Sequence, residues 1–121
     1  MRVLVVEDDL SIRETLAIVL EAYQHQADLV DSGEKALDYL SREWPDVMLL
    51  DLTLQGMSGE EVYQDILAKF GRVPPTVVLS AAQQGELRAR HLPGARFLSK
   101  PYTIEQLAEI IEQATSAKGA A

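Results

Sequence analysis

The sequence predicts an α/β domain in which helices cover both faces of a parallel sheet. Short apolar runs alternate with stretches whose apolar residues recur at helical spacing, and this alternation occurs five times along the 121 residues. Strands that alternate with helices form parallel sheets, because each helix crosses over the sheet in a right-handed sense before the next strand begins. We therefore expect a (βα)5 doubly wound parallel sheet.

The composition predicts one globular domain and excludes several classes of protein. Hydrophobic residues make up 47% of the chain and charged residues 25%, so we expect a domain over residues 1–116, followed at 117–121 by a flexible tail or the start of a linker. A net charge of −8 argues against direct nucleic-acid binding, which requires a basic surface. The absence of cysteine excludes a disulfide framework and thiolate metal sites.

The first strand and the first helix are joined by an acidic turn. Val3–Val6 is an apolar, β-branched run that stops at Glu7-Asp8-Asp9. The run is too short for a signal peptide or a membrane span, so we expect a cytoplasmic protein without membrane contact. A helix from Leu10 to about Tyr23 follows, and its apolar residues at close to helical spacing are Ile12, Leu16, Val19, Leu20 and Tyr23.

The second strand is weaker, and its helix is short. His25–Val30 predicts this strand, and an Asp-Ser-Gly turn at residues 31–33 closes it. We interpret Asp31 as a turn or cap acid, and we expect Trp44 to be a packing residue just after the helix. The apolar residues on one face of that helix are Ala36, Leu37 and Leu40.

The third strand is the centre of the prediction. Val47–Leu50 is a continuous apolar run, typical of a strand that is buried on both faces, and it ends on Asp51. Ser58 and Glu61 have capping-box spacing and predict the start of a helix, which Gly71 ends. The apolar side of this helix consists of Val62, Ile66, Leu67 and Phe70.

Two further strands complete the sheet. Thr76–Leu79 predicts the fourth strand and Ala95–Leu98 the fifth, with a short polar helix over roughly residues 84–92 between them. Thr103 caps the final helix. The apolar face of that helix consists of Ile104, Leu107, Ala108 and Ile111.

Polar side chains stand where four of the five strands end. Glu7 and Asp8 follow the first strand, Asp51 the third, Ser80 the fourth, and Lys100 lies just past the fifth. If the second strand lies at the edge, the order is 2-1-3-4-5, and these four strand ends become contiguous around Asp51. This is the flavodoxin-like order, in which ligands bind at the carboxyl ends of the strands near the switch point between the first and third strands.

Each of these polar residues also has a purely structural explanation. The acids of the first turn could stabilise the helix N-terminus that follows them. The Ser80 hydroxyl could satisfy its own turn, and Lys100 could be a solvated surface lysine. Their joint placement around Asp51 is what favours a functional site.

Several carboxylates held close together repel one another, and a hard divalent cation would remove this conflict. Oxygen ligands from Asp8, Asp51 and a backbone carbonyl near Thr53, completed by water, suit Mg²⁺. Glu7 would then act through a water molecule. The sequence therefore predicts a magnesium site at the end of the third strand.

A magnesium ion at this position favours phosphoryl chemistry. The ion can hold a phosphoryl oxygen while charge develops during an in-line transfer. Lys100 supplies a compact positive charge to the same group, and Ser80 supplies a hydroxyl donor. Asp51 retains a free oxygen that can act as a nucleophile and form an acyl phosphate.

Four motifs carry a resemblance to a known family. They are Val3-Leu4-Val5-Val6-Glu7-Asp8-Asp9, Met48-Leu49-Leu50-Asp51-Leu52 with Met57-Ser58-Gly59, Val78-Leu79-Ser80-Ala81, and Phe97-Leu98-Ser99-Lys100-Pro101-Tyr102. The motifs occur in order at the ends of the predicted strands. With them, over roughly residues 1–116, the chain resembles a response-regulator receiver domain of two-component signalling.

The resemblance implies a role for each residue of the predicted site. Asp51 would be the phosphoacceptor, Glu7 and Asp8 the acidic pair for Mg²⁺, Ser80 the switch hydroxyl, Lys100 the phosphate-binding lysine, and Phe97 the aromatic rotamer switch. The resemblance also implies a cis peptide bond between Lys100 and Pro101, which proline makes tolerable.

The resemblance further implies partners and an output. A sensor histidine kinase or a phosphotransfer protein would donate the phosphoryl group, docking near Ile12, Pro101 and Tyr102. Phosphorylation would change the face made by the fourth helix, the fifth strand and the fifth helix, and a downstream protein or an effector domain would recognise it. Such a domain catalyses its own phosphoryl transfer and slow dephosphorylation, so we expect a signalling module and not an enzyme.

Several residues depart from the common pattern of this family, and three of them bear on the predicted site. Gln55 stands where a proline is usual, which predicts a less rigid loop after Asp51. Ser80 replaces the commoner threonine but keeps the hydroxyl. Phe97 lacks a phenolic hydroxyl, so a switch at this position would work by packing.

Two other functions compete with the receiver hypothesis. An aspartate-dependent phosphohydrolase would also form an acyl phosphate, but it normally has a second acid where this chain has Thr53, and it has a cap domain for which this chain has no room. A constitutive docking module would not need the intact set of Glu7, Asp8, Asp51, Ser80 and Lys100.

Overall fold

The computed structural model describes residues 1–81, 88, 92 and 94–120, the last four of them by their backbone only. The short helix predicted over residues 84–92 lies outside the described residues, apart from Arg88 and Leu92. Among the residues described, no helix is both long enough and apolar enough to cross a membrane.

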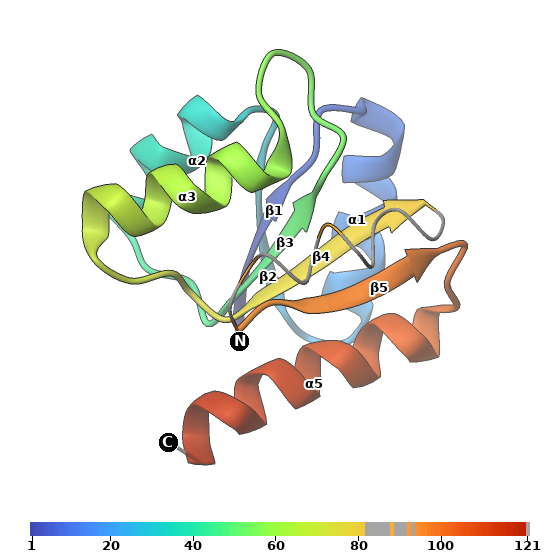
Figure 1. Ribbon diagram of the computed structural model, residues 1–121. Coiled ribbons are helices and arrows are strands. Elements are labelled where there is room, and N and C mark those ends of the chain that lie inside the picture. The colour runs from blue at the N-terminus through green and yellow to red at the C-terminus, as the bar shows by residue number, and fades with distance from the viewer. Residues whose placement is uncertain (82–87, 89–91, 93, 121) are drawn as a thin grey trace.

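The strands form one parallel sheet in the order β2-β1-β3-β4-β5, which confirms the predicted flavodoxin-like arrangement (Figure 1). Because all the strands are parallel, their carboxyl ends lie on the same side of the sheet. The order makes the ends of β1, β3, β4 and β5 neighbours there. The strands are β1 (Arg2–Val6), β2 (Gln26–Val30), β3 (Val47–Asp51), β4 (Thr76–Ala81) and β5 (Arg96–Lys100).

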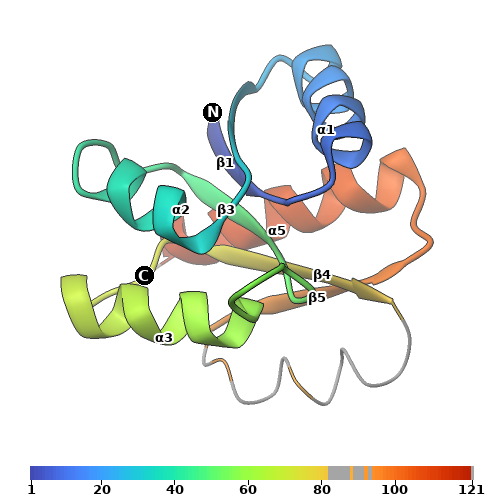
Figure 2. The ribbon, with the colours of Figure 1, turned by 90° about the horizontal axis from the view of Figure 1, so that it is seen from above.

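Helices cover both faces of the sheet (Figure 2). The helices α1 (Leu10–Ala22) and α5 (Ile104–Ala120) pack on one face, and α2 (Gly33–Leu40) and α3 (Gly59–Phe70) pack on the other. Successive strand residues point to opposite faces, so the strands contribute to two separate hydrophobic cores. For example, Val5 packs on the side of α1 and α5, whereas its neighbour Leu4 packs on the side of α2 and α3.

The burial of β3 and β2 follows from their positions at the centre and at the edge of the sheet. All five residues of β3 are buried, as the continuous apolar run predicted. In β2, by contrast, Gln26 and Leu29 are exposed, because the strand lies at the edge of the sheet. Because β3 is the central strand, Asp51 at its carboxyl end lies between the ends of β1 and β4.

Local hydrogen bonds set the helix ends where the sequence predicted them. The Ser58 hydroxyl accepts from the Glu61 amide at 3.2 Å and begins α3. Gly71 ends that helix in a left-handed conformation with φ of 73°. The Thr103 hydroxyl accepts from the Gln106 amide at 3.0 Å and caps α5.

The helix α5 extends to Ala120 and includes most of the segment predicted to be a tail. Alanine and lysine have high helix propensity, which favours this continuation. The domain division at residue 116 stays a prediction.

The structure corrects the predicted ends of β4 and β5. The sequence placed Ser80 and Lys100 just after their strands, but both residues belong to the strands. The reason is tertiary, because the ladder between β4 and β5 continues through the pairs Ser80 with Ser99 and Ala81 with Lys100. Backbone pairing thus extends these strands beyond their apolar runs.

Candidate functional site

Three polar side chains are buried where the central strands end. Glu7 is 2% exposed, Asp51 5% and Ser80 4%. Buried charged groups are rare unless they are paired, so their burial needs an explanation. The strand order brings them together from separate parts of the chain, as the sequence predicted.

Lys100 supplies the counter-charge. Its ammonium Nζ lies 3.1 Å from Oδ2 of Asp51 and 3.8 Å from Oε1 of Glu7. The other oxygen of Asp51, Oδ1, accepts a hydrogen bond from the Thr53 amide at 2.7 Å. Asp51 is therefore oriented from both sides. The peptide bond between Lys100 and Pro101, which follows this contact, is cis.

Glu7 is the carboxyl group whose ionisation the site disfavours. Burial, followed by the neighbouring Asp51 carboxylate, raises the pKa of Glu7 from 4.5 to about 8. Its Oε2 accepts a weak hydrogen bond from the Asp9 amide at 3.3 Å. Its Oε1 is buried and has no hydrogen-bond partner among the residues described. A buried oxygen in this state is suited to a ligand or a water molecule.

Asp8 is partly exposed and is tied to the loop after β3. Its Oδ2 accepts from the Gln55 amide at 3.0 Å. The Arg13 guanidinium donates to the carbonyl oxygens of Glu7 at 2.9 Å and of Asp8 at 3.0 Å, which fixes the backbone of the acidic turn. The sequence analysis did not identify Arg13. The one signal that could have identified it is its position in the first half of the helix that follows the acidic turn.

The donor set fits a hard divalent cation that retains part of its water shell. No three His, Cys, Asp or Glu side chains within the described ranges are arranged as a ready-made metal centre. Mg²⁺ does not require one, because it commonly binds one or two carboxylates together with several waters. Asp8, Asp51 and the Glu7 oxygen that accepts no hydrogen bond from the residues described supply such donors, and the Thr53 carbonyl stays a predicted ligand.

The two predicted switch residues do not contact Asp51 in this structure. The Ser80 hydroxyl donates to the Ala81 carbonyl at 3.3 Å. Phe97 lies earlier in β5, opposite Val78, and packs partly buried on the core beside α2 and α3. Both residues thus lie on strands that end at the site, with their side chains bonded or packed elsewhere.

A second arginine, Arg88, connects the start of α3 to the backbone just after β3. The Arg88 guanidinium forms a bidentate pair with the Glu60 carboxylate, and it also donates to the Leu52 carbonyl at 3.2 Å. The start of α3 is also packed tightly against β3. A Cβ atom at Gly59 would lie 2.7 Å from the Asp51 carbonyl oxygen. Sequence analysis missed the Arg88 pair, because its members are 28 residues apart.

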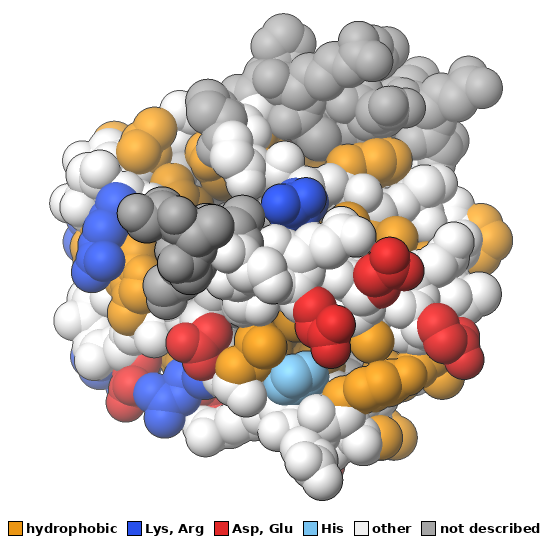
Figure 3. Space-filling model, turned by 90° about the horizontal axis from the view of Figure 1, so that it is seen from below, with side chains coloured by type: hydrophobic (Ala, Val, Ile, Leu, Met, Phe, Trp, Pro, Cys, Tyr) orange, Lys and Arg blue, Asp and Glu red, His pale blue; other side chains and the backbone are white. Residues whose placement is uncertain are grey.

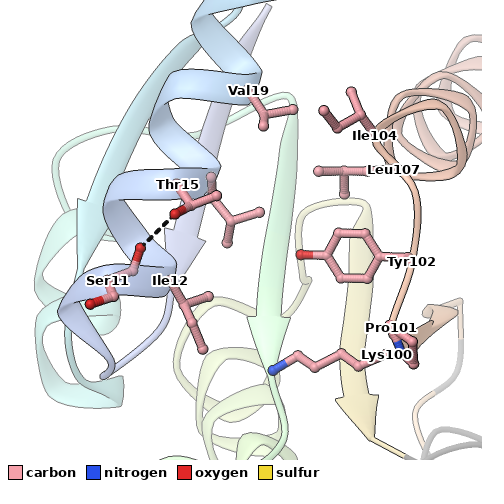
Figure 4. Close-up of a pocket in the computed structure, with 10 residues that line it drawn as sticks. Ser11, Ile12, Thr15, Val19, Lys100, Pro101, Tyr102, Ile104 and Leu107 are labelled. Carbon is pink, nitrogen blue, oxygen red and sulfur yellow. Dashed lines mark hydrogen bonds between the residues drawn. The ribbon is translucent and has the colours of Figure 1, made fainter.

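A groove of about 460 Å³ lies between α1 and the start of α5, next to Lys100. Figure 4 shows side chains from both helices pointing into it. The three residues predicted for docking, Ile12, Pro101 and Tyr102, all line this groove. Ile104 lies at its edge and is 50% exposed.

Figure 3 shows the molecule of Figure 1 from below. On this face, the described residues form no continuous basic patch. Lys and Arg side chains lie apart on it, among acidic and apolar ones. This distribution is in line with the net charge of −8.

Comparisons with known proteins agree on one family. The model of the response regulator receiver domain matches residues 3–112. The chain is 36% identical over 109 residues to the phosphate regulon transcriptional regulatory protein PhoB of Escherichia coli, covering 88% of this chain and 48% of PhoB. It is 33% identical over 109 residues to the response regulator MprA of Mycobacterium avium, covering 88% of this chain and 47% of MprA. The chain thus spans about half the length of these curated relatives.

A solved structure extends the comparison to the site. The receiver domain of the sensor histidine kinase PA1611 of Pseudomonas aeruginosa is 25% identical, with a TM-score of 0.86 over 95% of this chain and 97% of that one. That crystal structure has a magnesium ion coordinated in the active site cleft.

Proposed function

The chain belongs to the response regulator receiver domain family, and from this premise we propose that Asp51 accepts a phosphoryl group and that the domain passes this signal to a downstream partner. The observation that carries the proposal is the contact of 3.1 Å between Lys100 and the buried carboxylate of Asp51. This contact places a compact cation beside the one carboxylate that ends the central strand.

Two hydrogen bonds would orient Asp51 as the proposed nucleophile. The Thr53 amide holds one of its oxygens and Lys100 holds the other, and each oxygen keeps a further lone pair. In the proposed transfer, a carboxylate oxygen of Asp51 forms a bond to phosphorus while the bond from phosphorus to the donor histidine nitrogen breaks. The electron pair of that bond leaves with the nitrogen.

Bound Mg²⁺ would neutralise phosphoryl oxygens during the transfer. Asp8, Asp51 and the Thr53 carbonyl would hold the ion, with Glu7 acting through water. The Oε1 atom of Glu7 supports this assignment, because it accepts no hydrogen bond from the residues described and a water of a hydrated cation would donate one. The same residues would make the domain competent to phosphorylate itself from a small donor and to lose the phosphoryl group slowly.

Phosphorylation would act on the rest of the fold through charge. A phosphoryl group on Asp51 adds negative charge and acceptor oxygens beside Lys100. The Ser80 hydroxyl, bonded only weakly to Ala81 at 3.3 Å, would turn toward these oxygens and vacate space for Phe97. The face formed by the segment between β4 and β5, by β5 and by α5 would then shift toward its active state.

The groove beside Lys100 is the proposed docking site for the phosphoryl donor, a sensor histidine kinase or a phosphotransfer protein. The groove is mainly apolar, and Lys100, which lines it, also contacts Asp51. A histidine-bearing helix that packs on Ile12 and Tyr102 would therefore present its phosphoryl group to the site. The proposed output is a downstream protein or an effector domain, and we place the domain in the cytoplasm, without direct binding to nucleic acid or membrane.

Intact-mass spectrometry after incubation with acetyl phosphate and Mg²⁺ tests the phosphoacceptor. We expect one phosphoryl adduct on the wild type and none on Asp51→Asn. An adduct of equal yield on the variant would refute the assignment. Turnover of an organic phosphate beyond one equivalent per chain would instead favour a phosphohydrolase.

A further inference from the structure

Arg88 connects the part of the chain between β4 and β5 to the residue that follows the proposed phosphoacceptor. Its Nη2 donates to the Leu52 carbonyl at 3.2 Å, and the same carbonyl accepts from the Gly59 amide at 3.1 Å. Leu52 comes directly after Asp51 in the chain and is buried. The guanidinium of Arg88 is thus anchored beside the end of β3, where the proposed function puts the phosphoryl group.

Glu60, in the first turn of α3, binds the same guanidinium through two hydrogen bonds. Nε of Arg88 donates to Oε2 of Glu60, and Nη2 donates to Oε1. The other terminal nitrogen of Arg88, Nη1, makes no hydrogen bond to any residue within the described ranges. A planar guanidinium that is held along one edge presents its remaining N–H groups to a further acceptor.

The charge of Asp51 already acts on Arg88. The hydrogen bond to Glu60 raises the pKa of the Arg88 guanidinium, and the negative charges of Glu60 and Asp51 raise it further. A phosphoryl group on Asp51 would add negative charge and acceptor oxygens at this place. Phosphorylation would therefore strengthen the attraction between Arg88 and the end of β3, whereas it would leave the attraction to Glu60 unchanged.

We propose that Arg88 is a second cation for the phosphoryl group on Asp51, in addition to Lys100, and that Glu60 competes with the phosphoryl group for it. This inference rests on the proposed function and deepens it. Before phosphorylation Arg88 is bound by Glu60, and after phosphorylation its N–H groups donate to phosphoryl oxygens. Because Arg88 lies between β4 and β5 in the chain, this change of partner links the charge at Asp51 to the proposed output face.

The pair of Arg88 and Glu60 is suited to such an exchange because water reaches it. Their side chains are 37% and 28% exposed. An ion pair in contact with water contributes little to stability, since water solvates both charges when they separate. A guanidinium binds phosphoryl oxygens through charge-assisted hydrogen bonds whose geometry it matches. The contact with the phosphoryl group can therefore replace the contact with Glu60 while the domain stays folded.

The two members of the pair should have opposite effects on phosphorylation. The test measures the initial rate of labelling by acetyl phosphate in Mg²⁺, using intact-mass spectrometry. We expect Arg88→Met to label about tenfold more slowly than the wild type, because it loses a hydrogen bond between two charged groups. Glu60→Gln should label about two- to threefold faster, because it removes the competing carboxylate. Arg88→Lys keeps the cation and should recover most of the rate that Arg88→Met loses.

Arg42→Met and Asp38→Asn are the matched controls. They break an exposed ion pair of 2.9 Å that lies before the start of β3 in the chain, and both should label at the wild-type rate. Urea denaturation gives the folded fraction of each variant, so that rates are compared per folded protein. A merely structural pair would impair the protein through either partner, so changes in the same direction for Arg88→Met and Glu60→Gln would overturn the inference.

Equal rates in Arg88→Met and the wild type would also overturn the inference, and would leave the proposed function intact. A wild type that is not labelled at Asp51 would overturn both. NMR of the arginine side chains tests the change of partner directly. We expect the Arg88 side-chain signals to shift when acetyl phosphate and Mg²⁺ are added to the wild type, but not when they are added to Asp51→Asn. Unchanged Arg88 signals in the phosphorylated wild type would refute the exchange.

Discussion

The ammonium of Lys100 lies 3.1 Å from Oδ2 of Asp51, although β4 separates the strands that carry the two residues. The contact is possible because both residues end their strands at the same edge of the sheet, and both side chains reach along that edge. It pairs a carboxylate that is 93% buried with a cation that is itself three-quarters buried. The charge of Asp51 at the end of β3 thus interacts directly with the charge of Lys100 at the end of β5.

Removing Lys100 should destabilise the protein. Lys100→Met leaves the buried carboxylate of Asp51 without its cation, which typically costs about 1–3 kcal/mol. Lys35→Met is the matched control, because it breaks an exposed pair with Asp31 that is worth at most about 1 kcal/mol. Urea denaturation checks both values. A smaller loss in Lys100→Met than in the control would contradict the interpretation of the pair.

The metal-free protein should lose stability as the pH rises from about 4.5 to about 8 through the contribution of Glu7. In the unfolded chain Glu7 releases its proton near pH 4.5, but in the folded protein its pKa is about 8. Between these values the unfolded state binds fewer protons, so ionisation favours unfolding. Above pH 8 both states are ionised and the effect is complete.

Glu7→Gln isolates this contribution, because it removes the ionisation and keeps a polar side chain. We expect the variant to show a flatter dependence of unfolding free energy on pH between 5 and 8, and to be more stable than the wild type at pH 8 without Mg²⁺. The measurement is urea denaturation of both proteins at pH 5 and pH 8. Parallel pH profiles for the two proteins would count against the raised pKa.

Gly59→Ala should impair both stability and phosphorylation. The added Cβ would lie 2.7 Å from the Asp51 carbonyl oxygen and 2.7 Å from the Leu52 Cα, both backbone atoms that yield only if the end of β3 moves. Overpacking of this kind typically costs about 1–3 kcal/mol. We expect a lower initial rate of labelling by acetyl phosphate.

Gly71→Ala provides the control for Gly59→Ala. Gly71 has φ of 73° and no atoms around its would-be Cβ, so alanine there should cost about 1–2 kcal/mol through backbone strain alone. Because Gly71 ends α3 far from the strand ends, its labelling rate should equal that of the wild type. Equal labelling rates in all three proteins would show that Asp51 tolerates the displacement.

Ile104→Asp should separate docking from chemistry. Ile104 is 50% exposed at the edge of the groove, so the substitution should change stability by less than about 0.5 kcal/mol. Labelling by acetyl phosphate should be unchanged, whereas transfer from a phosphorylated histidine donor should slow. Leu67→Asp is the control for charge, because Leu67, which the sequence placed on the apolar side of α3, is exposed in the structure. A donor that labels both variants at the same rate would exclude the groove as its docking site.

The sequence by itself determined the fold and which polar residues stand at the carboxyl ends of the central strands. The continuous apolar run of β3 required burial on both faces, which made β3 central and put Asp51 at the middle of one sheet edge. The cap residues Ser58 and Thr103 set helix starts through bonds to amides three residues away. These features depend on neighbours in the chain, and so local physics was enough to predict them.

Only the tertiary structure decided how the site is held in place. Gln55 bonds Asp8 across 47 residues, and Arg88 bonds the Leu52 carbonyl across 36. In each case a backbone group is donor or acceptor, and every residue type except proline offers the same N–H and C=O. Side-chain patterns therefore carry no record of these bonds, because they arise only when strand register and loop path bring the backbone groups within reach.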